Sequence, residues 1–206
     1  MSRLFPILVC AAAVLFVQTA AAQDTAPDAL VRSVTEEVIS IIKQDQDIQA
    51  GNKRKTIALV EQKVLPHFDF ARMTALATGV GWRKATPEQQ TILVEQFRTL
   101  LVRTYSTALS AYRNQAIDVK PLRGRAGDAE VVVRSEVKQS GAAPMTIDYS
   151  MAKAPAGWKV YDVTIGGISL VTTYRETFAN EVQSGGIEGL IKSISDKNRQ
   201  LAAKGG

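Results

Sequence analysis

The sequence predicts an α+β fold in which a curved, four-stranded antiparallel sheet is covered on its apolar face by helices. Apolar residues recur at helical spacing up to about residue 112 and again after residue 169, whereas between 131 and 165 they alternate with polar ones. An antiparallel sheet with one apolar and one polar face is typical of a sheet covered on a single side. There is no internal repeat or low-complexity linker, so residues 23–206 are predicted to form one domain.

Residues 1–22 have the pattern of a cleaved signal peptide. Arg3 precedes an apolar stretch over 4–17, and Ala20-Ala21-Ala22 supplies the small residues of a cleavage site. The stretch is shorter than the roughly 20 residues that a membrane-spanning helix needs. The single cysteine, Cys10, would be removed with this segment. The sequence therefore predicts an exported, disulfide-free protein of the periplasm.

The first half of the chain predicts several helices before the sheet. Two apolar stripes at helical spacing come first: Val31, Val34, Val38, Ile41 and Ile42, and then Ile57, Val60 and Val64. Pro66 should end the second helix, and a short helix should run from Asp69 through Leu76 and stop before Gly79.

A long helix is predicted to begin at Thr86 and to run to about Tyr112. Thr86 can cap it, Pro87 suits the first helical position, and Gln89 can complete a capping box. One apolar stripe continues along the whole stretch: Leu93, Phe97, Leu100, Leu101, Thr104, Tyr105, Ala108 and Tyr112. At 1.5 Å per residue such a helix would be roughly 40 Å long, enough to lie across a sheet.

Three alternating runs, with a weaker strand near 117–122, predict the antiparallel meander. The residues expected on the apolar face are Val131, Val133, Ser135 and Val137, then Met145, Ile147, Tyr149 and Met151, then Lys159, Tyr161, Val163 and Ile165. Turn residues separate the runs at 124–128, 139–144 and 154–157. The last strand should bend at Gly166-Gly167 and lead into a helix from Ser169 to about Gln183, followed after Gly185-Gly186 by a final helix over 187–201.

The sequence contains no recognisable catalytic constellation. His67 is the single histidine, so an ordinary metal site lacks partners, and no phosphate-binding loop or nucleophile elbow occurs. Asp162 is expected to face solvent or to cap a neighbouring element. The net charge of +5 is dispersed in small clusters that suit a solvated face, an anionic headgroup or an acidic partner. We therefore predict no enzyme, no metal, no cofactor and no nucleic-acid partner.

Three blocks in order resemble a known family. They are Val64-Leu-Pro66 with Phe68-Asp-Phe-Ala-Arg-Met73, then Gly81-Trp-Arg-Lys-Ala-Thr-Pro-Glu-Gln-Gln90, then Trp158-Lys-Val-Tyr-Asp-Val163 with Gly167-Ile-Ser-Leu-Val171 and Tyr174-Arg175. Together these are similar to the MlaC, or toluene-tolerance, family of periplasmic phospholipid-binding proteins. The resemblance implies a cone related to nuclear transport factor, with acyl chains inside and the headgroup near the mouth. It also implies a lipid shuttle between an outer-membrane lipoprotein complex (MlaA-type with porin) and an inner-membrane ABC transporter (MlaD-type subunit), which would maintain outer-membrane asymmetry.

Under that resemblance, the apolar faces are expected to line a lipid cavity. The expected lipid-binding residues are Phe70, Met73, Leu76, Phe97, Leu101, Tyr105, Val133, Val137, Met145, Ile147, Tyr149, Val163, Ile165, Ile168, Leu170, Val171, Tyr174 and Phe178. Periodicity alone favours a packed core without a ligand, and it is the resemblance that favours a lipid cavity. Two alternatives therefore stay open: a docking module on the same fold that binds no lipid, and an enzyme with an acid or base on the inner sheet face.

Overall fold

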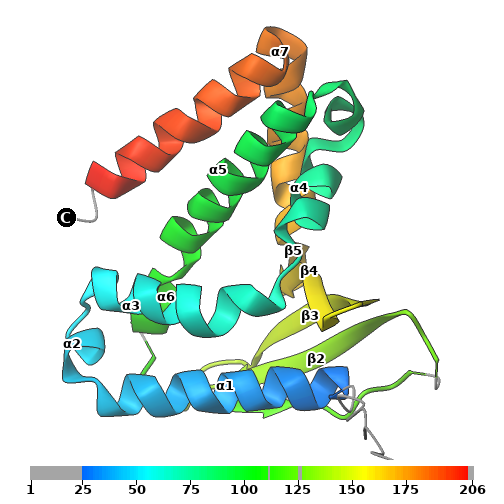
Figure 1. Ribbon diagram of the computed structural model, residues 1–206. Coiled ribbons are helices and arrows are strands. Elements are labelled where there is room, and N and C mark those ends of the chain that lie inside the picture. Colours follow the sequence, from blue (N-terminus) through cyan, green and yellow to red (C-terminus); the bar gives the residue numbers. More distant parts are fainter. Residues whose placement is uncertain (1–24, 111, 125–126, 204–206) are drawn as a thin grey trace, which may run out of the picture.

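The computed structural model describes residues 25–110, 112–124 and 127–203, with the side chains of Thr107 and Ser110 left out. The predicted signal peptide and its cleavage site lie outside these ranges. The helical elements are α1 (Pro27–Gln44), α2 (Gln46–Gln49), α3 (Lys53–Leu59), the π-helical turn η1 (Val60–Val64), the 3-10 turn η2 (Leu65–His67), α4 (Phe70–Thr78), the 3-10 turn η3 (Gly79–Lys84), α5 (Pro87–Tyr105), α6 (Thr107–Ser110) and α7 (Leu170–Ala203). The strands are β1 (Ala116–Val119), β2 (Glu130–Lys138), β3 (Met145–Ala154), β4 (Gly157–Ile165) and β5 (Ile168–Ser169) (Figure 1).

The predicted α+β class is confirmed, with a curved antiparallel sheet whose strands follow one another in the order β1-β2-β3-β4-β5. The fifth strand was not predicted and is two residues long. It forms because Gly166 and Gly167, with φ of 57° and 86°, make a tight turn that pairs Ile165 with Ile168. Two successive positive φ angles are typical of two-residue hairpin turns, which glycine adopts without steric cost.

The predicted alternation along β4 is wrong in its first half. Ser150 of β3 pairs with Asp162 of β4, but the next residue, Met151, pairs with Val160. This bulge leaves Tyr161 without a partner on β3. Val160, and not Tyr161, is therefore buried on the inner face. A bulge inserts one residue and shifts the phase of the strand. The Val160 carbonyl then accepts a 2.8 Å hydrogen bond from the Asp69 N–H, which fastens the chain between η2 and α4 to the sheet.

The displaced Tyr161 ties α4 to two strands. The Arg72 guanidinium lies 3.6 Å from the centre of the Tyr161 ring, and its Nη2 is 2.7 Å from the Glu130 carboxylate. The Tyr161 hydroxyl donates to the same carboxylate at 2.9 Å. Hydrogen bonds to Arg72 and Tyr161 hold the pKa of Glu130 below its usual value.

The long helix predicted to reach Tyr112 ends earlier, at Tyr105, and a short α6 follows. Beyond Ser106 the hydrogen bonds between residues four apart are replaced by one between residues three apart, in which the Leu109 N–H donates to the Ser106 carbonyl. The start of α5 is as predicted, because Thr86 and Gln89 form both bonds of a capping box at 3.2 and 2.9 Å. The two predicted closing helices are the halves of α7, which breaks at Gly186, where φ is 66°.

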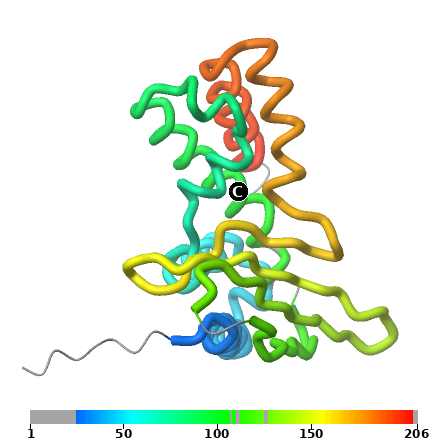
Figure 2. The backbone as a smooth tube through the Cα atoms, turned by 90° about the vertical axis from the view of Figure 1, so that its right-hand side faces the viewer, coloured from blue at the N-terminus to red at the C-terminus, as the bar shows by residue number. Residues whose placement is uncertain are grey.

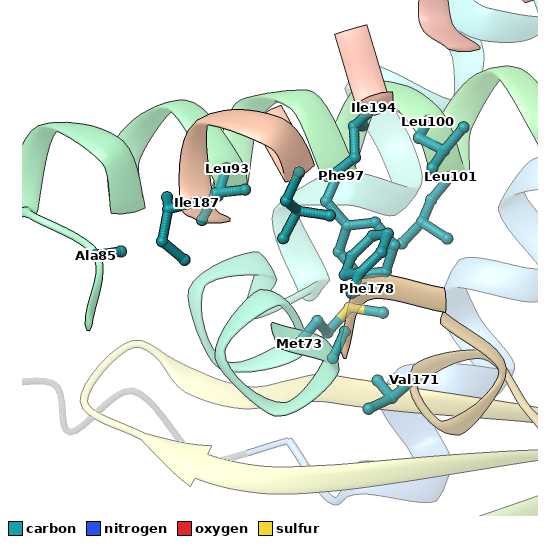
Figure 3. Packing of buried hydrophobic residues seen from close by; sticks show 12 residues of the cluster. Met73, Ala85, Leu93, Phe97, Leu100, Leu101, Val171, Phe178, Ile187 and Ile194 are labelled. Carbon is teal, nitrogen blue, oxygen red and sulfur yellow. The ribbon is translucent and has the colours of Figure 1, made fainter. Parts of the chain in front are cut away.

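The buried hydrophobic residues described by the structure form three clusters: a core among the helices α4, α5 and α7, a second core on the sheet, and a smaller cluster between α1, α2 and α3. The helical core packs α4, α5 and both halves of α7 around Phe97, which makes edge contacts with Tyr174 and Phe178 at ring separations of 5.0 and 5.1 Å. Figure 3 shows Phe97 and Phe178 side by side in this core. The sheet core lies on the inner face of β1–β4 against α1. Figures 1 and 2 show α4, α5 and α7 standing at one end of the molecule and the sheet with α1 at the other.

Asp162 caps α7 from the neighbouring strand, one of the two roles that the sequence suggested for it. Its carboxylate accepts hydrogen bonds from the N–H groups of Val163 (2.8 Å) and Val171 (3.1 Å) and from the Ser169 hydroxyl (2.6 Å). Ser169 in turn accepts from the Thr172 N–H at 3.0 Å. The carboxylate therefore satisfies donors at the helix N-terminus, where the helix dipole also favours a negative charge.

We expect Asp162→Ala to lower the free energy of unfolding by about 2 kcal/mol, because a cap is lost and amide donors are left without acceptors. Urea unfolding followed by circular dichroism measures this change. Asp148→Ala is the matched control, since Asp148 on β3 faces Arg134 at 4.0 Å, a separation that contributes little. Equal stability of the two variants would contradict the capping role.

Candidate ligand cavity

An apolar cavity of about 330 Å³ lies between α1, the η1–η2 segment, the end of α5 and the inner face of the sheet. One wall comes from α1, through Leu30, Val31, Val34, Thr35, Val38, Ile39 and Ile42. The helical wall opposite and the sheet provide Val60, Val64, Leu65, His67, Phe68, Phe70, Met73, Leu101, Val102, Tyr105, Ser106, Leu109, Tyr112, Ile117, Ile147, Tyr149, Met151, Val160, Val163, Ile165 and Leu170.

The cavity lining is nearly free of charge. No aspartate, glutamate, lysine or arginine belongs to it among the described residues, and its titratable side chains are His67 and three tyrosines. Burial, with the nearby charge of Lys159, lowers the pKa of His67 despite an opposing effect of Glu37, so the imidazole is neutral at pH 7. Burial raises the pKa of Tyr149, against a smaller opposite effect of the Ser135 hydroxyl. Such a lining suits hydrocarbon and disfavours any ionic group inside.

The structure brings half of the eighteen expected lipid-binding residues to this cavity. The residues that line it are Phe70, Met73, Leu101, Tyr105, Ile147, Tyr149, Val163, Ile165 and Leu170. The helical core holds Phe97, Val171, Tyr174 and Phe178, and the sheet core holds Val133. Val137 is half-buried, and Leu76, Met145 and Ile168 are exposed. Periodicity identifies apolar faces, but it cannot tell which part of a face packs against protein and which part borders a void.

The expected set omitted α1, which forms one whole side of the cavity, and η1, which belongs to the wall opposite. The signal was present in the sequence as the stripe from Val31 to Ile42, continued by Val60 and Val64. The stripe does not reveal, however, that α1 lies across the open side of the sheet. There the Arg32 guanidinium donates to the Val119 carbonyl at 2.7 Å, and Asp28 accepts from the Leu122 N–H at 3.2 Å.

The wall opposite α1 has an irregular backbone. Within fifteen residues the chain passes from α-helix to a π-helical turn over Val60–Val64 and then to a 3-10 turn that contains Pro66. π turns are rare and occur often at functional sites. Val60 and Val64 of this turn both line the cavity.

The rest of the described chain offers little other site chemistry. No group of three or more His, Cys, Asp or Glu residues that could hold a metal occurs within 25–110, 112–124 and 127–203. A larger hollow of about 740 Å³ lies on the outer face of the sheet, but charged side chains line it, among them those of Lys120, Arg134, Glu130 and Glu136. None of the described helices combines the length and apolar character that crossing a membrane requires.

Comparison with known proteins gives consistent results. The family model described as "MlaC protein" matches residues 32–196. The toluene tolerance protein Ttg2D of Pseudomonas putida is 29% identical over 169 residues, which cover 82% of this chain and 77% of that protein. The intermembrane phospholipid transport system binding protein MlaC of Haemophilus influenzae is 22% identical over 203 residues, or 97% and 95% of the two chains.

Among solved structures, the phospholipid-binding protein of Ralstonia solanacearum, determined in complex with a phospholipid, superposes with a TM-score of 0.80. It is 44% identical in sequence, and the superposition covers 85% of this chain and 98% of that one.

Proposed function

Because this chain belongs to the MlaC family, we propose that it is a periplasmic phospholipid carrier that holds acyl chains in the cavity between α1, η1–η2, α5 and the sheet. Its partners would be an outer-membrane lipoprotein complex of MlaA type with porin and an inner-membrane ABC transporter with an MlaD-type subunit. Moving lipid between them would maintain outer-membrane asymmetry. No catalytic step is part of this proposal.

The observation that supports it most directly is the uncharged apolar cavity. Two 16-carbon chains expose about 30 methylenes, and at ~0.8 kcal/mol each their passage through water costs on the order of 24 kcal/mol. A carrier needs no reacting group, since an apolar lining that replaces the bilayer removes this cost. The relative from Ralstonia solanacearum, whose structure contains a phospholipid, supports the same ligand class.

The cavity is partly open at the surface of the molecule. Its apolar lining is therefore in contact with water when no ligand is present. Acyl chains that cover this lining would remove that contact, which favours a cavity filled by hydrocarbon over one that stays empty.

We expect the protein purified from the periplasm to release close to one phospholipid per chain on extraction with organic solvent, quantified by mass spectrometry. Delipidated protein should melt at a lower temperature and recover on reloading, because a ligand that binds the folded state alone stabilises it. A docking module that binds no lipid would yield no stoichiometric phospholipid, and its melting temperature would not respond to reloading.

A further inference from the structure

One edge of the cavity lies where α1 meets the η1–η2 segment, and we call it the α1–η edge. Val34 and Val38 of α1 line the cavity together with Val64 and His67 of the opposite wall. An ion pair joins the two walls, between the Lys63 ammonium and the Glu37 carboxylate at 2.6 Å. Figure 1 shows α1 and the α3–η1 segment running alongside each other here.

Lys159 of β4 brings a positive charge next to this edge, just outside the residues that line the cavity. Its ammonium donates to the Pro66 carbonyl at 2.5 Å, which holds it beside η2. An ammonium has three donors, and within the described residues no carboxylate lies at ion-pair distance from this one. Two donors of Lys159 are therefore available to a ligand.

His67 adds a second group with unused hydrogen-bonding capacity. It belongs to the cavity lining, and neither of its ring nitrogens bonds to a protein group in the part of the chain that the structure describes. The charges that act on it are those of Lys159 and Glu37, so both the lysine and the ion pair of the edge lie near the imidazole. Lys63 offers less positive charge to a ligand than Lys159 does, because Glu37 already neutralises Lys63.

A phospholipid needs a place for its anionic phosphate, and the uncharged interior cannot supply one. The end of the sheet near Met145 and Ile168 is no better suited to a phosphate, because these exposed side chains (45% and 66%) are apolar. We propose that Lys159 and His67 form the site that binds the phosphodiester group of the lipid, at the α1–η edge of the cavity. This inference rests on the proposed carrier function and adds the residues that recognise the headgroup phosphate.

The single histidine gives a direct test by proton NMR on protein without a histidine tag. The protein is loaded with dipalmitoyl phosphatidylglycerol or with dipalmitoylglycerol, which has the same acyl chains and no phosphate, and His67 is titrated in both. A nearby anion favours the imidazolium, so the pKa of His67 should be about one pH unit higher with the phospholipid. Acyl chains desolvate His67 equally in both samples, so identical titrations would overturn the proposal.

Substitution gives an independent test. Lys159→Met should lower the ratio of phosphatidylglycerol to dipalmitoylglycerol taken up from mixed vesicles by at least about threefold, because a charge-assisted hydrogen bond is lost. Lys84→Met removes an equal charge from an exposed position on η3, a turn that contributes no residue to the cavity lining, and should leave the ratio unchanged. An unchanged ratio in Lys159→Met would refute the phosphate site.

Failure of the inference and failure of the proposed function have different signatures. If the unsubstituted protein takes up neither lipid, the carrier function itself fails. If it takes up phosphatidylglycerol but neither the ratio nor the pKa of His67 responds, the function stands and the phosphate site is wrong. Soluble glycerophosphoglycerol is a third arm: if it shifts the His67 titration as strongly as the lipid at equal concentration, the site binds free phosphate esters and the lipid assignment is overturned.

Discussion

Ile147→Glu should reduce phospholipid retention by at least about a hundredfold, or about 2.7 kcal/mol, while the protein still folds. Ile147 is half-buried and lines the cavity from β3, so a carboxylate there can be hydrated when lipid is absent. Acyl chains in the cavity would remove that hydration, and the cost of burying the charge falls on the lipid-bound state. Lipid content by mass spectrometry and thermal melting of the delipidated variant measure the two effects separately.

Val133→Glu is the matched control for this prediction. Val133 lies on the neighbouring strand and the same sheet face, but it is fully buried in the sheet core and does not line the cavity. A glutamate there has no access to water in the lipid-free or in the lipid-bound protein. The unpaired charge should therefore lower the free energy of unfolding by about 3–5 kcal/mol. If Ile147→Glu folds normally and still contains a full complement of phospholipid, Ile147 does not border the ligand.

Phe97→Ala should lower the free energy of unfolding by about 4 kcal/mol without changing the lipid content of the molecules that remain folded. Phe97 is fully buried and packs against Tyr174 and Phe178, and truncation leaves a void in the helical core. At this chain length the melting temperature should fall by about 8–16 °C.

Ile92→Ala is the control on the same helix. Ile92 is 44% exposed, so its truncation should change stability by less than about 0.5 kcal/mol. Selective loss of lipid from folded Phe97→Ala would instead place Phe97 in the ligand site, as the family resemblance implied.

Several parts of the fold could be predicted because they depend on short-range physics. The capping box of Thr86 and Gln89 is local, and so is the helix break at Gly186, where a positive φ requires glycine. The alternation of β2 is also local, and it places Val133 and Ser135 on the buried face as expected. The family could be recognised because its motifs are contiguous blocks.

The rest depends on contacts between distant segments. The bulge that leaves Tyr161 unpaired arises where Asp69 bonds to Val160, a pairing across about ninety residues that no local pattern encodes. The apolar stripe of α1 likewise could not predict where this helix lies over the sheet. Its position depends on contacts such as that between Arg32 and Val119.

The sequence by itself therefore determined the α+β class, the start of α5 and the break in α7, the family and the apolar character of the faces. The tertiary structure decided which apolar residues border a void and which pack in a core: Ile147 and Tyr149 at the cavity, Phe97 and Val133 away from it. The physical reason is that hydrophobic periodicity reports that a side chain avoids water, and both a core and an acyl chain satisfy that condition. A cavity exists only through the spacing of α1, η1 and the sheet, which is set by long-range packing.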